Sequence, residues 1–302
     1  MAITLCARST KKSVSIPRAR SAATVAADGR SMKPVRKPAV AGTFYPSDPA
    51  ILLRDIRRYT PSDARMLPCI GGVVPHAGYV YSGRVAGAVY ARMQLASRIV
   101  LLGPNHTGYG QPLAIMSSGS WLTPLGEAKI DEALARQLAA RFPLLQEDAE
   151  AHLKEHCLEV QIPFLQALAS NLTFVPVVLG TRRLEVLIRL GETLAELLKA
   201  EKTNVLILAS SDMNHYEPDE ITRLKDAKAI DKILALDAAG LHDVVHREKI
   251  SMCGFAPTIS MVAAARSMGA QRAELVKYAT SADVSGDREY CVGYAGITVT
   301  RQ

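Results

Sequence analysis

Two histidines occupy matching positions at the ends of apolar runs in this chain. His76 follows the run CIGGVVP at 69–75, and His106 closes the run RIVLLGPN at 98–105. Each run has the pattern of a buried strand and passes through a proline before the imidazole. In a mainly parallel α/β sheet, residues just beyond the carboxyl ends of the strands line the ligand crevice. The sequence therefore predicts that two imidazoles from different strands converge on one metal ion.

A third strand end adds groups that can transfer protons. The run VLILA at 205–209 leads into SSDMNH at 210–215. Asp212 and His215 are three residues apart, so a helical turn would place them on one face and let the carboxylate orient or acidify the imidazole. The alternative is that Asp212 only caps the turn, which is a common role for aspartate.

His156 and Cys253 are two further candidates. The segment EHCLE at 155–159 is predicted to open an amphipathic helix with His156 and Glu159 on one side, although such spacing is common on exposed helix faces. Cys253 precedes a predicted helix whose first turn contains Pro257. Backbone N–H groups at a helix start favour a thiolate, which binds metals and attacks electrophiles.

Composition limits the classes of function. The chain has 302 residues, is 48% hydrophobic and 22% charged, and carries a formal charge of +7. Nine Lys and Arg residues against one Asp within positions 1–37 account for +8, which leaves 7 − 8 = −1 for the rest. A nearly neutral body lacks the basic face that phosphate backbones require, so no nucleic-acid partner is expected.

Compartment is inferred from apolar stretches and cysteines. No apolar stretch approaches the ~20 residues of a transmembrane helix, so we expect a soluble protein without a membrane partner. Five cysteines without a CxxC pair predict a reducing compartment, and we expect a cytoplasmic protein. Residues 1–34 are predicted to be a disordered or targeting extension, and an organellar location would follow from a transit segment. A third reading places the true start at Met32.

Periodicity predicts a single α/β domain over residues 35–302. Strands that alternate with helices imply right-handed crossovers and a mainly parallel central sheet flanked by helices. The last two strands are expected to pair antiparallel. The predicted strands are 70–74, 98–102, 113–117, 173–179, 204–209, 274–279 and 291–300, and the predicted helices are 49–59, 83–93, 130–141, 157–169, 184–200, 221–236, 238–245 and 256–268.

Seven segments in order resemble the Memo family, which includes protein B of the AmmeMemoRadiSam system. The resemblance runs from about residue 35 to residue 297, and the chain before it lies outside. The segments that carry it are 36–46, 75–83, 103–106, 155–165, 210–212 with His215, 253–254 and 279–287.

The resemblance implies a fold similar to that of class III non-haem iron extradiol dioxygenases. It also implies a metal in a vestibule, with iron or copper as the expected cofactor and zinc as an alternative. The dioxygenases use two histidines and one carboxylate, whereas a softer thiolate donor shifts the metal preference and puts ring cleavage in doubt. The implied metal ligands are His76, His106 and Cys253, and the implied acid–base groups are His156, Asp212 and His215.

The leading functional hypothesis is a metal-dependent redox protein whose substrate is unknown. The second is a non-catalytic adaptor that binds a peptide or small molecule in the same vestibule, lined by Tyr79, Tyr81 and Tyr216. The family resemblance adds radical-SAM and AMMECR1-like proteins of the same system as expected partners.

A third hypothesis treats the cysteine as a nucleophile. Cys253 would attack, His215 would act as base and Asp212 would orient the base, as in thiol hydrolases. This hypothesis leaves the two strand-end histidines without a role.

Overall fold

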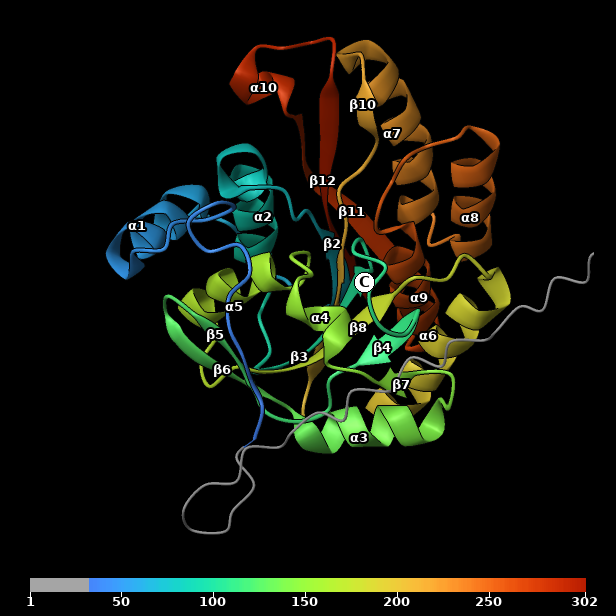
Figure 1. Cartoon of the computed structure of the whole chain (residues 1–302). Helices are drawn as coiled ribbons and strands as arrows, with labels where there is room; N and C mark the ends of the chain where they lie inside the picture. The colour runs from blue at the N-terminus through green and yellow to red at the C-terminus, as the bar shows by residue number, and fades with distance from the viewer. Residues whose placement is uncertain (1–32) are drawn as a thin grey trace, which may run out of the picture. The chain divides into compact units, whose positions relative to one another are not determined.

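The structure, a computed structural model, describes residues 33–302, so the extension predicted over residues 1–34 lies outside it apart from its last two residues. Pro34–Gln302 cluster as one compact unit around a twelve-stranded sheet (Figure 1). The strands are β1 (Val35–Arg36), β2 (Cys69–Val74), β3 (Arg98–Pro104), β4 (Leu113–Ile115), β5 (Ser120–Thr123), β6 (Gly126–Ile130), β7 (Gln146–Glu147), β8 (Thr173–Leu179), β9 (Val205–Ser210), β10 (His215–Glu217), β11 (Arg272–Thr280) and β12 (Cys291–Thr300). The helices are α1 (Pro49–Tyr59), α2 (Tyr79–Arg92), α3 (Glu132–Arg141), α4 (Glu150–Leu153), the 3-10 helix η1 (Glu159–Gln161), α5 (Ile162–Leu168), α6 (Leu184–Lys199), α7 (Asp219–Leu234), α8 (Ala238–Arg247), α9 (Phe255–Ser267) and α10 (Ala282–Ser285).

The centre of the sheet is parallel, as predicted. Strands β8, β3, β9 and β2 are neighbours in that order and run in the same direction. Their residues are almost all buried, which explains why they read as continuous apolar runs in the sequence. Because parallel strands end at one edge, the segments after β2, β3 and β9 leave the sheet together.

Antiparallel strands extend the sheet on both sides, so the sheet as a whole is mixed. Strand β12 pairs with β2, β10 and β11, and this confirms the predicted antiparallel pair at the C-terminal end. On the other side β4 runs antiparallel to β8, and β5 and β6 form a hairpin.

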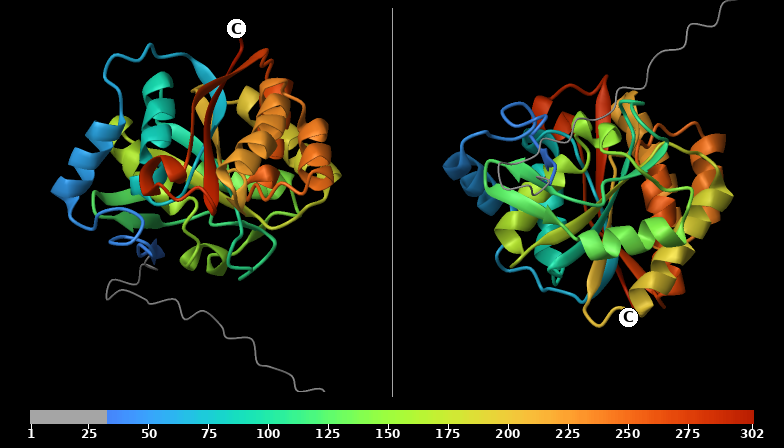
Figure 2. Two further views of the ribbon diagram at one scale, coloured as in Figure 1. Left: turned by 90° about the horizontal axis from the view of Figure 1, so that it is seen from above. Right: turned by 60° about the horizontal axis from the view of Figure 1, so that its bottom comes forward.

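Helices cover both faces of the sheet (Figure 2). Neighbouring side chains of a strand point to opposite faces, and two glycines of β2 report what lies on each. A Cβ atom on Gly71 would meet Met261 of α9, whereas one on Gly72 would meet Met93, which follows α2. Helix α9 contacts β2, β3 and β9 with α6 and α8 outside it, while α2 packs with α1 and α5 on the opposite face.

Two predictions about local structure are wrong. The helix predicted from residue 130 begins after Asp131, whose carboxylate caps it by accepting from the Leu134 N–H at 3.1 Å. The helix predicted over residues 157–169 is a turn followed by η1 and α5, so His156 precedes the helical segment.

A buried ion pair anchors the start of the described chain. The Arg36 guanidinium donates to Glu159 Oε2 at 2.7 Å and to the Glu155 carbonyl at 2.8 Å. Glu159 also accepts from Ala39 N at 2.7 Å and from the Tyr45 hydroxyl at 2.6 Å. Glu159 therefore faces this anchor instead of sharing a helix face with His156, as the spacing had predicted.

We predict that Glu159→Ala destabilises the fold by about 3–5 kcal/mol, because it leaves the Arg36 charge buried without its partner. Urea unfolding followed by circular dichroism measures the change. The matched control is Glu185→Ala, which breaks the exposed pair with Arg183 and is expected to leave stability nearly unchanged. Equal effects of the two substitutions would contradict a structural role for the buried pair.

Candidate metal centre

All the site residues predicted from the sequence line one cavity. It has a volume of about 570 Å³ and lies at the edge where the parallel strands end. Its walls also include Phe44, Tyr216 and Tyr294. The predicted residues among its lining are His76, His106, His156, Asp212, His215 and Cys253.

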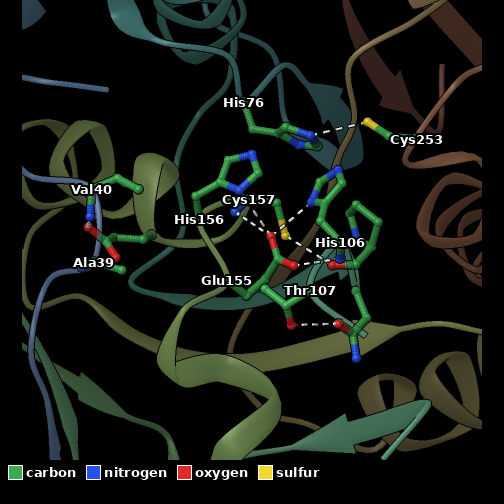
Figure 3. A network of polar contacts seen from close by, with 12 residues as sticks. Ala39, Val40, His76, His106, Thr107, Glu155, His156, Cys157 and Cys253 are labelled. Atoms are coloured by element: carbon green, nitrogen blue, oxygen red, sulfur yellow. Dashed lines mark hydrogen bonds and ion pairs between the residues drawn. The ribbon is translucent and has the colours of Figure 1, made fainter. Parts of the chain in front are cut away.

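Three imidazoles form one of two groups of potential metal ligands within residues 33–302. His76, His106 and His156 each offer a nitrogen, and these atoms lie within 4.8 Å of one another. The ring centroid of His76 lies 5.2 Å from that of His106 and 5.5 Å from that of His156. Figure 3 shows the three rings together. His156, which the sequence suggested as an acid–base group, thus lies where a metal ligand would.

The Nδ1 atom of His76 is held by a chain of buried hydrogen bonds. Ser210 Oγ donates to the Cys157 carbonyl at 2.7 Å and accepts from the Gln161 amide at 2.8 Å. The second lone pair of Ser210 Oγ is left to accept a hydrogen bond from His76 Nδ1, which lies 2.9 Å away. This assigns the proton to Nδ1 and leaves the lone pair on Nε2, the nitrogen that faces Cys253.

Glu155 is the functional residue that the sequence reasoning did not single out. Its Oε1 lies 2.9 Å from His106 Nδ1 and 3.3 Å from His156 Nδ1, and its Oε2 accepts from His106 N at 2.6 Å. A carboxylate on Nδ1 orients an imidazole and raises its basicity at Nε2. The only signal in the sequence was its position next to His156.

The ionisation of this group follows from burial and contact. Burial lowers the pKa of His76 well below its usual value, and neighbouring His156 and His106 lower it further. Burial likewise lowers the pKa of His156 to about 4, against the opposing effect of Glu155. Burial raises the pKa of Glu155, but the hydrogen bond and charge of His106 outweigh it and bring the value to about 2. The neutral imidazoles of His76 and His156 suit metal binding.

The Cys253 thiol borders this group on the side of His76. Its Sγ lies 3.1 Å from His76 Nε2 and accepts from Asp212 N at 3.3 Å. Burial raises the pKa of Cys253 well above its usual value, and the Asp212 charge adds to this. The sequence predicted that the helix start would favour the thiolate, but burial outweighs it. Gly254 is required here, because a Cβ would collide with the Ser210 carbonyl.

Within residues 33–302 no hydrogen bond joins Asp212 to His215, although the charge of His215 lowers the pKa of Asp212 against the larger effect of burial. The segment between β9 and β10 is irregular, not helical, and Asp212 Oδ1 accepts from the backbone of His76 at 2.7 Å and of Ala77 at 3.3 Å. His215 Nδ1 instead lies 2.9 Å from the Ser251 carbonyl, so its Nε2 is the nitrogen without a backbone partner. Asp212 therefore fixes the His76 loop, and both residues still line the cavity.

A second group of potential ligands lies behind the first. His106, Glu155 and Cys157 also place donor atoms within 4.8 Å of one another. These atoms are already engaged, since the Cys157 thiol donates to the Pro104 carbonyl and Glu155 accepts from Cys157 N. Burial raises the pKa of Cys157 well above its usual value. We therefore infer that Glu155 and Cys157 hold the three imidazoles in place and do not form a second metal site.

A buried aspartate positions the loop that carries His215. Asp226 accepts from Asn214 N at 2.8 Å and from the Tyr278 hydroxyl at 2.6 Å. The Asn214 side chain accepts from Ser251 N and Oγ, both at 3.0 Å, and Ser251 Oγ accepts from His215 N at 2.7 Å. Burial raises the pKa of Asp226 to about 7 despite these hydrogen bonds.

Fold and site together define an α/β protein with a histidine and cysteine cluster at the carboxyl edge of parallel strands. The sequence pattern of the family described as "Memo-like protein" matches residues 36–298. The chain therefore belongs to the Memo family. No helix within residues 33–302 is both long enough and apolar enough to cross a bilayer.

Archaeal relatives support the same assignment. A MEMO1 family protein of Methanopyrus kandleri is 42% identical over 280 residues, covering 88% of this chain and 99% of the relative. One of Archaeoglobus fulgidus is 44% identical over 272 residues, covering 87% and 98%. A crystal structure of an uncharacterized protein from Escherichia coli K12 is 13% identical with a TM-score of 0.46, covering 65% of this chain and 85% of that one, which is too distant to add to the argument.

We predict that Asp226→Asn removes a pH dependence of stability. A carboxyl whose pKa is raised to about 7 by folding stabilises the protein below its unfolded value near 4, and this contribution is lost as pH rises through about 7. The unfolding free energy of the wild type relative to Asp226→Asn should therefore fall between about pH 4 and pH 7, by at most about 1.4 kcal/mol per pH unit.

Urea unfolding at several pH values measures this difference. The matched control is Asp231→Asn on an exposed position of the same helix, and it should follow the wild-type profile. Parallel profiles for wild type and Asp226→Asn would show that this carboxyl is not held protonated by the fold.

Proposed function

We propose that this protein is a metal-dependent redox protein that binds iron or copper, with His76, His106 and Cys253 as ligands. The observation that supports it is the convergence of three imidazoles and one thiol in a single cavity. The substrate is an unknown small molecule or peptide that enters this cavity.

The donor set fits such a metal. Imidazole nitrogen suits iron, copper and zinc, and a thiolate favours the softer copper and zinc ions or a retuned iron. His76 and His106 present Nε2 while Nδ1 is held by Ser210 and by Glu155. A bound iron or copper ion would supply one-electron chemistry, whereas zinc would supply only Lewis acidity.

The other residues of the cavity have distinct proposed roles. His156 is near enough to serve as a further nitrogen ligand, because its nitrogen lies within 4.8 Å of the ligand nitrogens of His76 and His106. His215 faces the same cavity with Nε2 free of a backbone partner, so it is the proposed proton carrier. Burial raises the pKa of Asp212, and its backbone N–H contacts the Cys253 thiol. Asp212 is therefore the proposed partner of His215 in proton transfer.

The alternative is a non-catalytic adaptor that uses the same cavity to hold a peptide or small ligand. The aromatic side chains of Phe44, Tyr216 and Tyr294 in the lining support this hypothesis, since aromatic walls beside convergent polar groups suit ligand capture. Of the tyrosines expected there, only Tyr216 lines the cavity. Tyr79 is buried and donates to the Val160 carbonyl at 2.6 Å.

The thiol hydrolase hypothesis loses support. Cys253 contacts His76, not His215, and Asp212 accepts from backbone N–H groups. A thiol hydrolase needs its nucleophile hydrogen-bonded to the base and the base hydrogen-bonded to a carboxylate. Neither contact is present among Cys253, His215 and Asp212. Radical-SAM or AMMECR1-like partners and a likeness to the dioxygenase fold remain part of the proposal that rests on the family resemblance. The proposed cytoplasmic location rests on the cysteine usage.

We predict that His106→Ala and Cys253→Ala each reduce the affinity for Fe(II) or Cu(I) by about 100-fold or more, because loss of a ligand should exceed the 10–100-fold cost of losing an outer partner. Competition titration against a chelator and elemental analysis of protein purified without chelators provide the measurement. His156→Ala separates the two possible ligand sets: a loss as large as that of His106→Ala would make it a ligand.

The controls for the metal titration are His242→Ala and Cys69→Ala, which remove the same groups at positions that do not line this cavity. They should bind metal as the wild type does. Wild-type affinity in both His106→Ala and Cys253→Ala would remove the proposed metal centre, and exclusive binding of Zn(II) would remove its redox role.

We predict that metal-loaded protein consumes oxygen catalytically in the presence of a reductant such as ascorbate. Oxygen uptake measured with an electrode should fall about 100-fold in His215→Ala at unchanged metal content, because a positioned proton carrier contributes about 10²–10⁴-fold to a rate. Free metal at the same concentration is the control. Stoichiometric metal binding without turnover would favour the adaptor.

A further inference from the structure

A second cavity lies beside the first, across the segment that carries Cys253. Its volume is about 410 Å³, and Ser251 and Cys253 line both cavities. The end of α8, the loop after it, the start of α9 and the loop after β8 contribute its walls. Three of its lining residues are basic, namely Arg182, His246 and Lys249, and none is acidic.

Arg182 carries an unneutralised charge at this cavity. Its guanidinium lies 5.7 Å from the centroid of the Phe255 ring. Within residues 33–302 its side chain has no hydrogen-bond acceptor or ion-pair partner, whereas the next residue, Arg183, pairs with Glu185 at 2.6 Å. The planar guanidinium therefore keeps its five N–H donors for a ligand, in a fork that matches phosphate oxygens.

Lys249 and His246 add two more donors from the opposite wall. Lys249 has a positive φ of 51°, in the turn that follows α8. Its ammonium has no carboxylate partner in the described chain, because the adjacent Glu248 pairs with Lys228 and with Arg247. His246 Nδ1 lies 2.7 Å from the His242 carbonyl, which leaves Nε2 for another contact.

The start of α9 adds to the positive field but does not carry the inference. Its N-cap, Gly254, makes no side-chain capping hydrogen bond, and a helix start attracts anions. Glu185 pairs with Arg183, Glu248 pairs with Lys228 and Arg247, and Asp243 lies 3.6 Å from His242 Nδ1. Asp212 contacts the shared residue Cys253 through its backbone N–H, but it lines the first cavity and not this one.

We propose that this cavity is an anion site that binds a phosphate group, either as the free ion or as a phosphate monoester. Three exposed basic side chains, one from the loop after β8 and two from the end of α8 and the turn after it, line one cavity whose lining contains no carboxylate. A tetrahedral dianion satisfies this arrangement. Because Ser251 and Cys253 line both cavities, a phosphate bound here would lie on the other side of the segment that carries the Cys253 thiol. The site does not depend on the metal.

Isothermal titration of the full chain at low ionic strength with inorganic phosphate and with methyl phosphate tests this site. We expect saturable binding of one ligand per chain. Arg182→Ala and Lys249→Ala should each weaken it about 10- to 100-fold, the loss of a hydrogen bond to a charged group. Tight binding of both ligands assigns the site to phosphate esters, and binding of inorganic phosphate alone assigns it to the free ion. Either result supports the proposal.

The matched control is Arg183→Ala, which removes the same charge one residue away and outside the cavity lining. It should change phosphate affinity by less than about threefold, since exposed charges at a distance are screened. Absence of saturable binding to the wild type, or equal losses in Arg182→Ala and Arg183→Ala, would overturn the proposal. Metal content measured on the Arg182→Ala protein should equal that of the wild type. Loss of phosphate binding can therefore be distinguished from loss of metal binding.

Discussion

The arrangement of the candidate metal ligands depends on the contact of the buried Glu155 carboxylate with two imidazoles. One oxygen lies within 3.3 Å of Nδ1 on both His106 and His156, and the other accepts from the His106 backbone. Without this carboxylate the two Nδ1 atoms would face a poorly solvated space without an acceptor, and the rings would be free to rotate. A single negative charge thus fixes which nitrogen each ring presents to the cavity.

The position of that carboxylate is determined by the fold. Arg36 donates to the Glu155 carbonyl and pairs with Glu159, so the turn between α4 and η1 is held against the first described strand. From the same turn, the Cys157 carbonyl accepts from Ser210 Oγ, which in turn holds His76 Nδ1. The four ligand candidates are consequently connected through one set of buried hydrogen bonds, and a change in any member should be felt by the others.

The sequence predicted the parts of this site that depend on strand ends. His76, His106 and Asp212 follow apolar strands, and parallel strands must finish at one edge. Their convergence was therefore accessible from pattern alone. The positions of Glu155 and His156 were not, because a helix was expected where the chain forms a turn, and nothing in the spacing indicates that Glu155 faces two rings. The contact of His215 with Ser251 was not accessible from the pattern either, since Ser251 lies 36 residues away in the chain.

Charge balance gives the cluster a definite response to a cation. The imidazoles of His76 and His156 are already neutral, because burial lowers the pKa of each. The thiol of Cys253 is protonated, because burial raises its pKa. A divalent ion that took the thiolate would therefore displace one proton, from sulfur, and none from these two rings. Asp212 N donates to that sulfur, and the Asp212 carboxyl faces the same cavity, so a path for the proton begins beside the atom that must lose it.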